Sequence, residues 1–132
     1  METLQEFQPR LVYNNYKEHI KVSHELDFKN CDSFELSVAF IADSGLAALK
    51  ECFDYLRDHN IRGKIITSTY LGFNAPSMFK KLLKYENIEV KIFEGKGFHP
   101  KGYIFHKNDQ TDIMIGSSNL TQNALAVNQE WN

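Results

Sequence analysis

Short apolar runs recur along the chain and predict a series of strands. FELSVAF (34–40), KIITSTY (64–70) and IEVKIF (88–93) are typical of buried strands. Two further strands are predicted over 100–106 and 111–116, with only the turn KNDQ between them. Because so short a connection leaves no room for a crossover helix, we expect this last pair to form an antiparallel hairpin.

Between the strands, apolar positions recur every three or four residues, which is the spacing of one helix face. The first predicted helix is capped by Asp43 or Ser44 and has as its apolar face Leu46, Leu49, Phe53 and Leu56. A second helix is predicted over 76–85, and the side chains expected to face the core are those of Met78, Leu82 and Tyr85. Helical segments are also expected within 11–30 and from about Leu120. Strands that alternate with helices predict a single α/β layered domain over 1–132 with a mixed central sheet.

Composition narrows the class of protein. The 132 residues are 42% hydrophobic and 24% charged, as in ordinary globular domains, which argues against disorder. No apolar run reaches the length of a membrane span, and the amino end lacks the pattern of a signal peptide, so a cytoplasmic protein is expected. Cys31 and Cys52 are interpreted as reduced and buried. Because Trp131 follows a predicted helix with no closing element, we expect the sequence to be an excised piece of a longer protein.

Charge is distributed unevenly although the net charge is only -2. Residues 62–107 contain 9 Lys and Arg against 3 Asp and Glu, whereas residues 1–61 contain 6 against 11. A positive block of this kind suits an anionic polymer that binds one face. For Lys80, Lys81 and Lys84 taken alone, the better interpretation is that they form the solvent-exposed face of a helix and do not bind a polymer.

Residues with reactive side chains gather in the last third of the chain. On an extended strand His99 and Lys101 leave from the same face. The segment Gly116-Ser117-Ser118-Asn119 ends the next strand, so its backbone N–H groups and the Ser117 and Asn119 side chains can meet an anion held by Lys101. Glu130 follows Asn119 by 11 residues.

This combination, HPK, then GSSN, then Glu130, resembles the HKD signature of the phospholipase D superfamily. The sequence segments around the motif resemble one branch of this superfamily, which is found at the amino end of some DEAD/DEAH-box helicases and in certain restriction endonucleases. These segments are TSTYLG, FHPKGYIF, GSSNLT and NQEWN. The resemblance implies a layered α-β-α fold with a mixed sheet. It also implies a longer parent protein, fused to helicase or restriction-enzyme domains, that uses ATP if it carries a helicase.

The resemblance implies a phosphodiesterase that needs no metal or other cofactor. His99 would attack phosphorus to give a phosphohistidine. Lys101 and Asn119, with Ser117, would hold the non-bridging oxygens, and Glu130 would orient the histidine. Since the family uses two such motifs per active site and this chain has one, a homodimer with a shared site is expected.

One position departs from the signature, which has Asp five residues after the lysine where this chain has His106. By strand parity His106 faces away from His99 and Lys101, so the family's Asp is interpreted as a supporting residue. A zinc pair of His99 and His106 is disfavoured for the same reason.

Three function classes follow from these residues. The first is a nuclease that cleaves DNA as a homodimer. The second is a nucleic-acid-binding accessory module of a helicase or restriction enzyme, with little activity alone. A lipid-cleaving enzyme is third, because the motif's Asp is absent and no amphipathic membrane-binding segment is seen. Possible nucleic-acid contacts are Tyr70, Phe73, Lys96 and Phe98, although loop aromatics also pack on their own domain.

Overall fold

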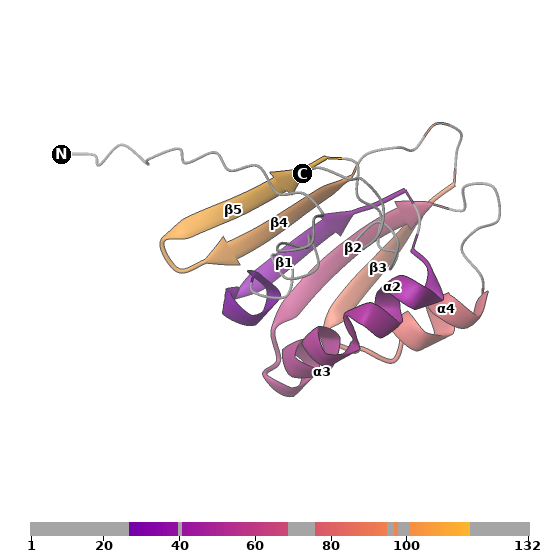
Figure 1. Ribbon diagram of the computed structural model, residues 1–132, viewed down its shortest axis with the longest axis horizontal. Helices are drawn as coiled ribbons and strands as arrows, with labels where there is room; N and C mark the ends of the chain where they lie inside the picture. Colours follow the sequence, from indigo (N-terminus) through magenta and orange to yellow (C-terminus); the bar gives the residue numbers. More distant parts are fainter. Residues whose placement is uncertain (1–26, 40, 69–75, 95–96, 98–100, 117–132) are drawn as a thin grey trace, which may run out of the picture.

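The computed structural model describes residues 27–39, 41–68, 76–94, 97 and 101–116. In this part of the chain one mixed sheet has the strand order β3-β2-β1-β4-β5 (Figure 1). The strands are β1 (Ser33–Ser37), β2 (Arg62–Ser68), β3 (Ile88–Phe93), β4 (Gly102–Lys107) and β5 (Gln110–Ile115). Strands β1, β2 and β3 run parallel, whereas β4 is antiparallel to both β1 and β5.

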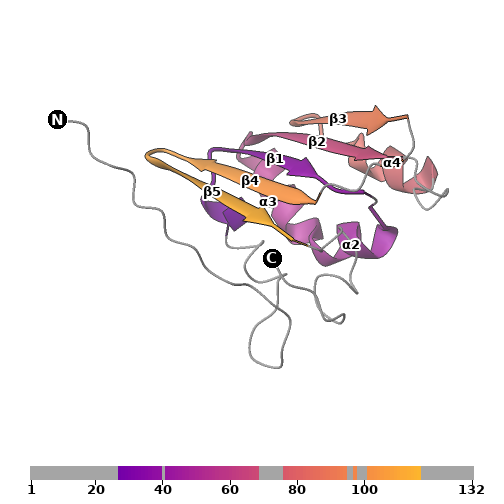
Figure 2. The same cartoon turned by 90° about the horizontal axis from the view of Figure 1, so that it is seen from above.

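The helices described beside this sheet are α2 (Asp43–Ala48), α3 (Lys50–Asp58) and α4 (Pro76–Leu82). All three lie on the same face of the sheet (Figure 2). The predicted α/β class with a mixed central sheet is thereby confirmed. The predicted hairpin is confirmed as well, since Lys107 pairs with Gln110 across a turn of Asn108 and Asp109.

The face that the helices cover carries the hydrophobic core, because alternate residues of each strand point to it. Phe28, from a helical turn at 27–30, lies among the largest buried side chains. Its ring stands edge-on to Phe34 and Phe105, with centroids 5.2 and 5.0 Å away. Such aromatic pairs contribute about 0.5–1.5 kcal/mol each beyond the area they bury. The aromatic cluster therefore fixes the turn before β1 against the centre of the sheet.

The first predicted helix is divided in two. Leu49 has φ -108° and ψ 13°, so it ends α2 and begins α3. All four predicted face residues are nevertheless buried. The predicted cap is wrong: Ala42 occupies the capping position without a side-chain bond, and Asp43 instead accepts a hydrogen bond from Lys81 on α4 (3.3 Å). The apolar pattern thus predicted the buried face of the segment correctly. The Asp43 carboxylate contacts Lys81 on α4 and does not cap α2.

The second predicted helix ends earlier than the pattern suggested. α4 stops at Leu82, and a turn follows in which the Ile88 N–H donates to the Tyr85 carbonyl (3.1 Å). Met78 is buried as predicted, and Tyr85 packs against the core from outside the helix. Both cysteines, Cys31 and Cys52, are free and buried, which confirms their predicted state.

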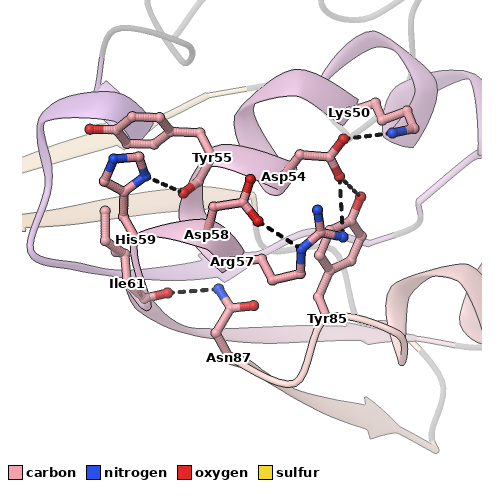
Figure 3. A network of polar contacts seen from close by, with 9 residues as sticks. All are labelled: Lys50, Asp54, Tyr55, Arg57, Asp58, His59, Ile61, Tyr85 and Asn87. Carbon is pink, nitrogen blue, oxygen red and sulfur yellow. Dashed lines mark hydrogen bonds and ion pairs between the residues drawn. The ribbon is translucent and has the colours of Figure 1, made fainter.

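Figure 3 shows polar contacts that join α3 to the turn before β3. Tyr85 Oη donates to Asp54 Oδ1 (2.9 Å), and the Arg57 guanidinium lies 5.7 Å from the centre of the Tyr85 ring. Asn87 Nδ2 donates to the Ile61 carbonyl (2.7 Å) at the start of β2. These contacts hold the amino ends of β2 and β3 against α3.

The pH dependence of stability tests the contact between Tyr85 and Asp54. Burial, followed by the hydrogen bond with Asp54, raises the pKa of Tyr85 to about 12. In the unfolded chain a phenol ionises near pH 10. The stabilisation is therefore complete below about pH 10 and is lost as the pH rises to about 12. We expect the native chain to lose more unfolding free energy than Tyr85→Phe over this interval.

Urea denaturation at several pH values measures this difference. Tyr55→Phe is the matched control, because it removes a phenol from α3 without changing the contact of Tyr85 with Asp54. Equal pH dependence in the native chain and in Tyr85→Phe would contradict the prediction.

Lys107, the last residue of β4, binds two carboxylates. Its Nζ donates to Asp27 Oδ1 (3.0 Å) and to Asp112 Oδ2 (2.5 Å). The Lys107 and Asp27 side chains are each only 20% exposed. Burial raises the pKa of Asp27, whereas the hydrogen bond from Lys107 lowers the pKa of Asp112. This cluster ties the turn at 27–30 to the β4–β5 hairpin.

Lys107→Met is expected to lower the unfolding free energy at pH 7 by about 1–3 kcal/mol, because it leaves a buried carboxylate without its partner. Since burial already raises the pKa of Asp27, the loss should shrink as the pH falls and this carboxylate becomes protonated. Urea denaturation at about pH 7 and pH 4 measures the loss. The control is Lys29→Met, at an exposed lysine of the same turn. An equal effect of the two substitutions would refute the prediction.

Candidate functional site

Several strand ends meet at one edge of the sheet. The carboxyl ends of the parallel strands β1, β2 and β3 lie there, which is where ligands bind in many open α/β sheets. Gly102, the first residue of β4, pairs with Ser37 at the end of β1 and with Ile115 at the end of β5. The start of β4 and the end of β5 therefore lie beside the ends of the parallel strands. We call this the carboxyl edge.

Lys101 and Gly116 are brought together at the carboxyl edge. Lys101 directly precedes β4, Gly116 directly follows β5, and the Gly116 N–H donates to the Lys101 carbonyl (3.4 Å). Lys101 is half-buried. These residues belong to the two parts of the sequence motif, the HPK segment and the GSSN segment. The hairpin register thus brings the described ends of both parts to one place.

The other predicted site residues lie outside the described part of the chain and remain predictions. Among the proposed catalytic set these are His99, Ser117, Asn119 and Glu130, and among the proposed nucleic-acid contacts they are Tyr70, Phe73, Lys96 and Phe98. Of the helical segment expected within 11–30, only the turn at 27–30 is described, and the segment expected from about Leu120 lies outside the described part.

His106, which stands at the motif's Asp position, lies on the other face of the sheet from the core. It neighbours Phe105, which is buried under the helices, and it pairs in register with Ser33. Its Nε2 lies 3.0 Å from Glu35 Oε2. His106 thus alternates with Phe105 as strand geometry requires, and its orientation relative to His99 stays a prediction because residue 99 lies outside the described residues. The contact with Glu35 gives this histidine a structural partner away from the carboxyl edge.

Two buried polar residues at the end of β2 were not assigned a role from the sequence. Thr67 and Ser68 are 0% and 1% exposed. Ser68 Oγ donates to the Ala39 carbonyl (2.6 Å), which joins the end of β2 to the chain that leaves β1. A signal existed in the sequence: TST follows an apolar run at the point where a buried strand ends. We interpret this bond as a support that shapes the carboxyl edge.

The positive block is distributed over several surfaces. Lys107 lies at the far end of β4 and is bound to Asp27 and Asp112, and Lys81 on α4 is bound to Asp43. Lys64 and Lys91 project from the sheet face that the described helices leave uncovered. The excess of lysine between 62 and 107 therefore does not form one continuous binding face in the described structure.

A shallow groove of about 330 Å³ lies on that uncovered face, lined in part by Glu35, Ser37, Lys64, Ile66 and Ile104. Its lining does not include Lys101. No group of three His, Cys, Asp or Glu side chains able to hold a metal ion occurs within the described ranges. Nor does any described helix have the length and apolar character needed to cross a bilayer.

Comparison with known families decides the assignment. Residues 33–132 match the family model described as cardiolipin synthase, PLD-like domain. The chain belongs to the PLD-like domain family. Membership confirms the resemblance at the level of the phospholipase D superfamily and supports chemistry on phosphodiesters. It does not distinguish the helicase and restriction-enzyme branch from other branches.

One of two similar solved structures, the first below, supports the fold of this PLD-like domain. Polyphosphate kinase from Porphyromonas gingivalis superimposes with a TM-score of 0.64 and 13% identity, over 93% of this chain and 19% of that one. TrmBL2, an archaeal chromatin protein with a novel mode of DNA binding, gives a TM-score of 0.48 and 16% identity over 99% of this chain and 47% of that one. The chain thus spans less than half the length of either. A search of curated proteins gave no match.

Proposed function

We propose that this PLD-like domain is a metal-independent nuclease that cleaves DNA through a phosphohistidine intermediate. The observation that carries the proposal is the contact between Lys101 and Gly116, which brings the ends of both motif segments to the carboxyl edge. Family membership supports the phosphodiester class of substrate. The choice of DNA, and of a cytoplasmic helicase or restriction protein as the parent, rests on the motif's resemblance.

The proposed reaction has two displacements. In the first, the His99 nitrogen attacks phosphorus, a P–O bond breaks, and the leaving oxygen takes a proton from a second histidine. In the second, water attacks the phosphorus, the N–P bond breaks, and the water's proton passes to that second histidine. Lys101, Asn119 and Ser117 hold the non-bridging oxygens as charge develops on them. Glu130 orients His99 and favours its charged form.

The second histidine is proposed to be His99 of another copy. One chain carries one motif, so a two-fold dimer supplies the pair, with one histidine as nucleophile and the other as general acid. Their titration then belongs to the pair, which predicts a bell-shaped pH profile for cleavage.

The test is cleavage by the native chain in excess EDTA. Labelled single-stranded DNA, double-stranded DNA and anionic phospholipid vesicles are offered separately, the last because the matched family model bears the name of a cardiolipin synthase. DNA cleavage with transient phosphate labelling of the protein supports the proposal. If phospholipid is cleaved and DNA is not, the substrate is a lipid and the proposed DNA substrate is wrong. If EDTA abolishes the cleavage of DNA, the metal-independent mechanism is wrong.

A binding module is the alternative, favoured by the exposed Lys64 and Lys91 on the sheet face that the described helices leave uncovered. In that case the domain holds DNA phosphates for a larger helicase or restriction enzyme and turns over little alone. DNA affinity would fall with added salt and would survive His99→Ala. No binding at low salt excludes this alternative.

A further inference from the structure

Strand β3 forms one border of the described sheet. Its inner edge pairs with β2, and no described strand pairs with its outer edge (Figure 2). Two of its apolar side chains are exposed, Ile92 at 44% and Phe93 at 41%. An open strand edge presents N–H and C=O groups that can pair with another strand.

The hydrogen bonds to β2 determine which backbone groups of β3 point outward. The Gly63 N–H donates to the Asn87 carbonyl (3.0 Å), while Gly63 pairs in register with Ile88. Backbone groups alternate in direction along a strand, so Glu89 and Lys91 also point their backbone toward β2. The backbone groups of Val90 and Ile92 therefore point to the open edge, with the Ile88 carbonyl. The Ile88 N–H is already donated to Tyr85.

A second copy of the chain can pair with this edge antiparallel, across a two-fold axis perpendicular to the sheet. Outward-pointing residues must then face each other, which permits a pairing centred on any one residue of the strand. Pairings centred on Val90 or Lys91 engage five of the six strand residues, more than pairings centred elsewhere. A pairing centred on Glu89 or on Lys91 places like charges directly opposite each other. The pairing centred on Val90 places Glu89 of each copy opposite Lys91 of the other.

The Val90-centred pairing also matches the apolar residues. Ile88 of one copy faces Ile92 of the other, and Val90 faces itself, on the side of the sheet that carries the core. Glu89 and Lys91 lie on the opposite side and already form an ion pair within one strand, at 3.4 Å. In the pairing, four charges of alternating sign lie together, and about four backbone hydrogen bonds form.

From this complementarity we infer that the outer edge of β3 is a self-association surface, which joins two copies into one continuous sheet centred on Val90. Single edge lysines usually oppose such pairing. Here Glu89, two residues from Lys91, makes the edge complementary to itself. Strand β5, the other border of the described sheet, lacks this property, because its one charged residue, Asp112, is bound to Lys107.

This surface is separate from the proposed shared active site. The two-fold axis through β3 turns the carboxyl edges of the two sheets in opposite directions. The contact therefore does not complete the Lys101 site, and the inference does not depend on the proposed nuclease activity.

Charge exchange tests the pairing. Lys91→Glu places Glu opposite Glu at two positions, and we expect the self-association constant to fall at least about tenfold. The double variant Glu89→Lys/Lys91→Glu restores opposite charges and should restore association. Sedimentation equilibrium of the 132-residue chain measures both. A native chain that is monomeric at all concentrations, or association unaffected by Lys91→Glu, would overturn the inference.

Cysteine cross-linking tests the register and separates this surface from any other dimer contact. Residues 89 and 91 of the two copies should face each other with Cα atoms about 4.5 Å apart, within disulfide reach. Mildly oxidised mixtures of Glu89→Cys and Lys91→Cys chains should therefore cross-link. Each variant alone should not, and the native chain, whose Cys31 and Cys52 are buried, is the background. Absence of a cross-link in the mixture, or equal cross-linking in the separate samples, refutes the pairing.

Discussion

His99→Ala is expected to reduce cleavage of DNA in EDTA by about ten-thousandfold or more, with the chain still folded. The reason is chemical: in the proposed reaction the imidazole nitrogen forms the bond to phosphorus, so its removal abolishes the first displacement. Single-turnover cleavage at saturating protein separates this loss from a loss of binding. DNA affinity should change little, because in the proposed site the phosphate is held by Lys101 and the backbone around Gly116.

The matched control is His106→Ala. His106 lies on β4 and contacts Glu35 on the sheet face away from the core. Its replacement should leave cleavage within about threefold of the native rate, a margin typical of a residue that makes no contact with the reacting atoms. A loss as large as that of His99→Ala would mean that His106 takes part in the site, and the assignment of catalytic residues would be wrong.

Gly63→Ala is expected to have the largest effect on stability, a loss of about 3 kcal/mol or more. Gly63 lies on β2 beneath the ring of Phe34, with which it pairs in register. A Cβ at this position would come within 2.0 Å of Phe34 Cζ. The ring is held by Phe28, so it has little freedom to move away. Denaturant unfolding measures the loss.

A second substitution identifies the cause of that loss. Phe34→Leu shortens the side chain above residue 63, so Gly63→Ala should cost less in the Phe34→Leu background than in the native chain. Gly102→Ala is the control for replacing a strand glycine, since a Cβ there meets only Ile115 Cγ2 at 3.9 Å. We expect Gly102→Ala to change stability by less than about 1 kcal/mol. Additive losses in the double variant would contradict the steric explanation.

The strands were predicted well because their signal is local. IEVKIF spans β3 to the residue, and the short turn KNDQ was sufficient to predict the hairpin. The helix boundaries were predicted less well. The apolar face from Leu46 to Leu56 was correct, but the break at Leu49 and the contact of Asp43 with Lys81 on α4 were not predicted. A periodic pattern records which side of a helix is buried and does not record where the helix bends.

For the site, residue types and spacing gave the HPK, GSSN and Glu130 motif, and strand parity predicted that His106 faces away from His99 and Lys101. The motif is readable because phosphate chemistry requires particular side chains at fixed separations. The order of the strands in the sheet, in contrast, was not predicted from the sequence. The pairing of Gly102 with both Ser37 and Ile115 brings Lys101 to Gly116 and forms the carboxyl edge.

Sequence by itself determined the alternation of strands and helices, the family motif and the face on which each strand residue lies, since these depend on neighbours within a few positions. Tertiary structure decided which strands are adjacent, that Lys107 is held by Asp27 and Asp112, and that β3 presents an outer edge. These features join residues that are distant in the chain. They are fixed by the packing of the whole sheet, which no local pattern records.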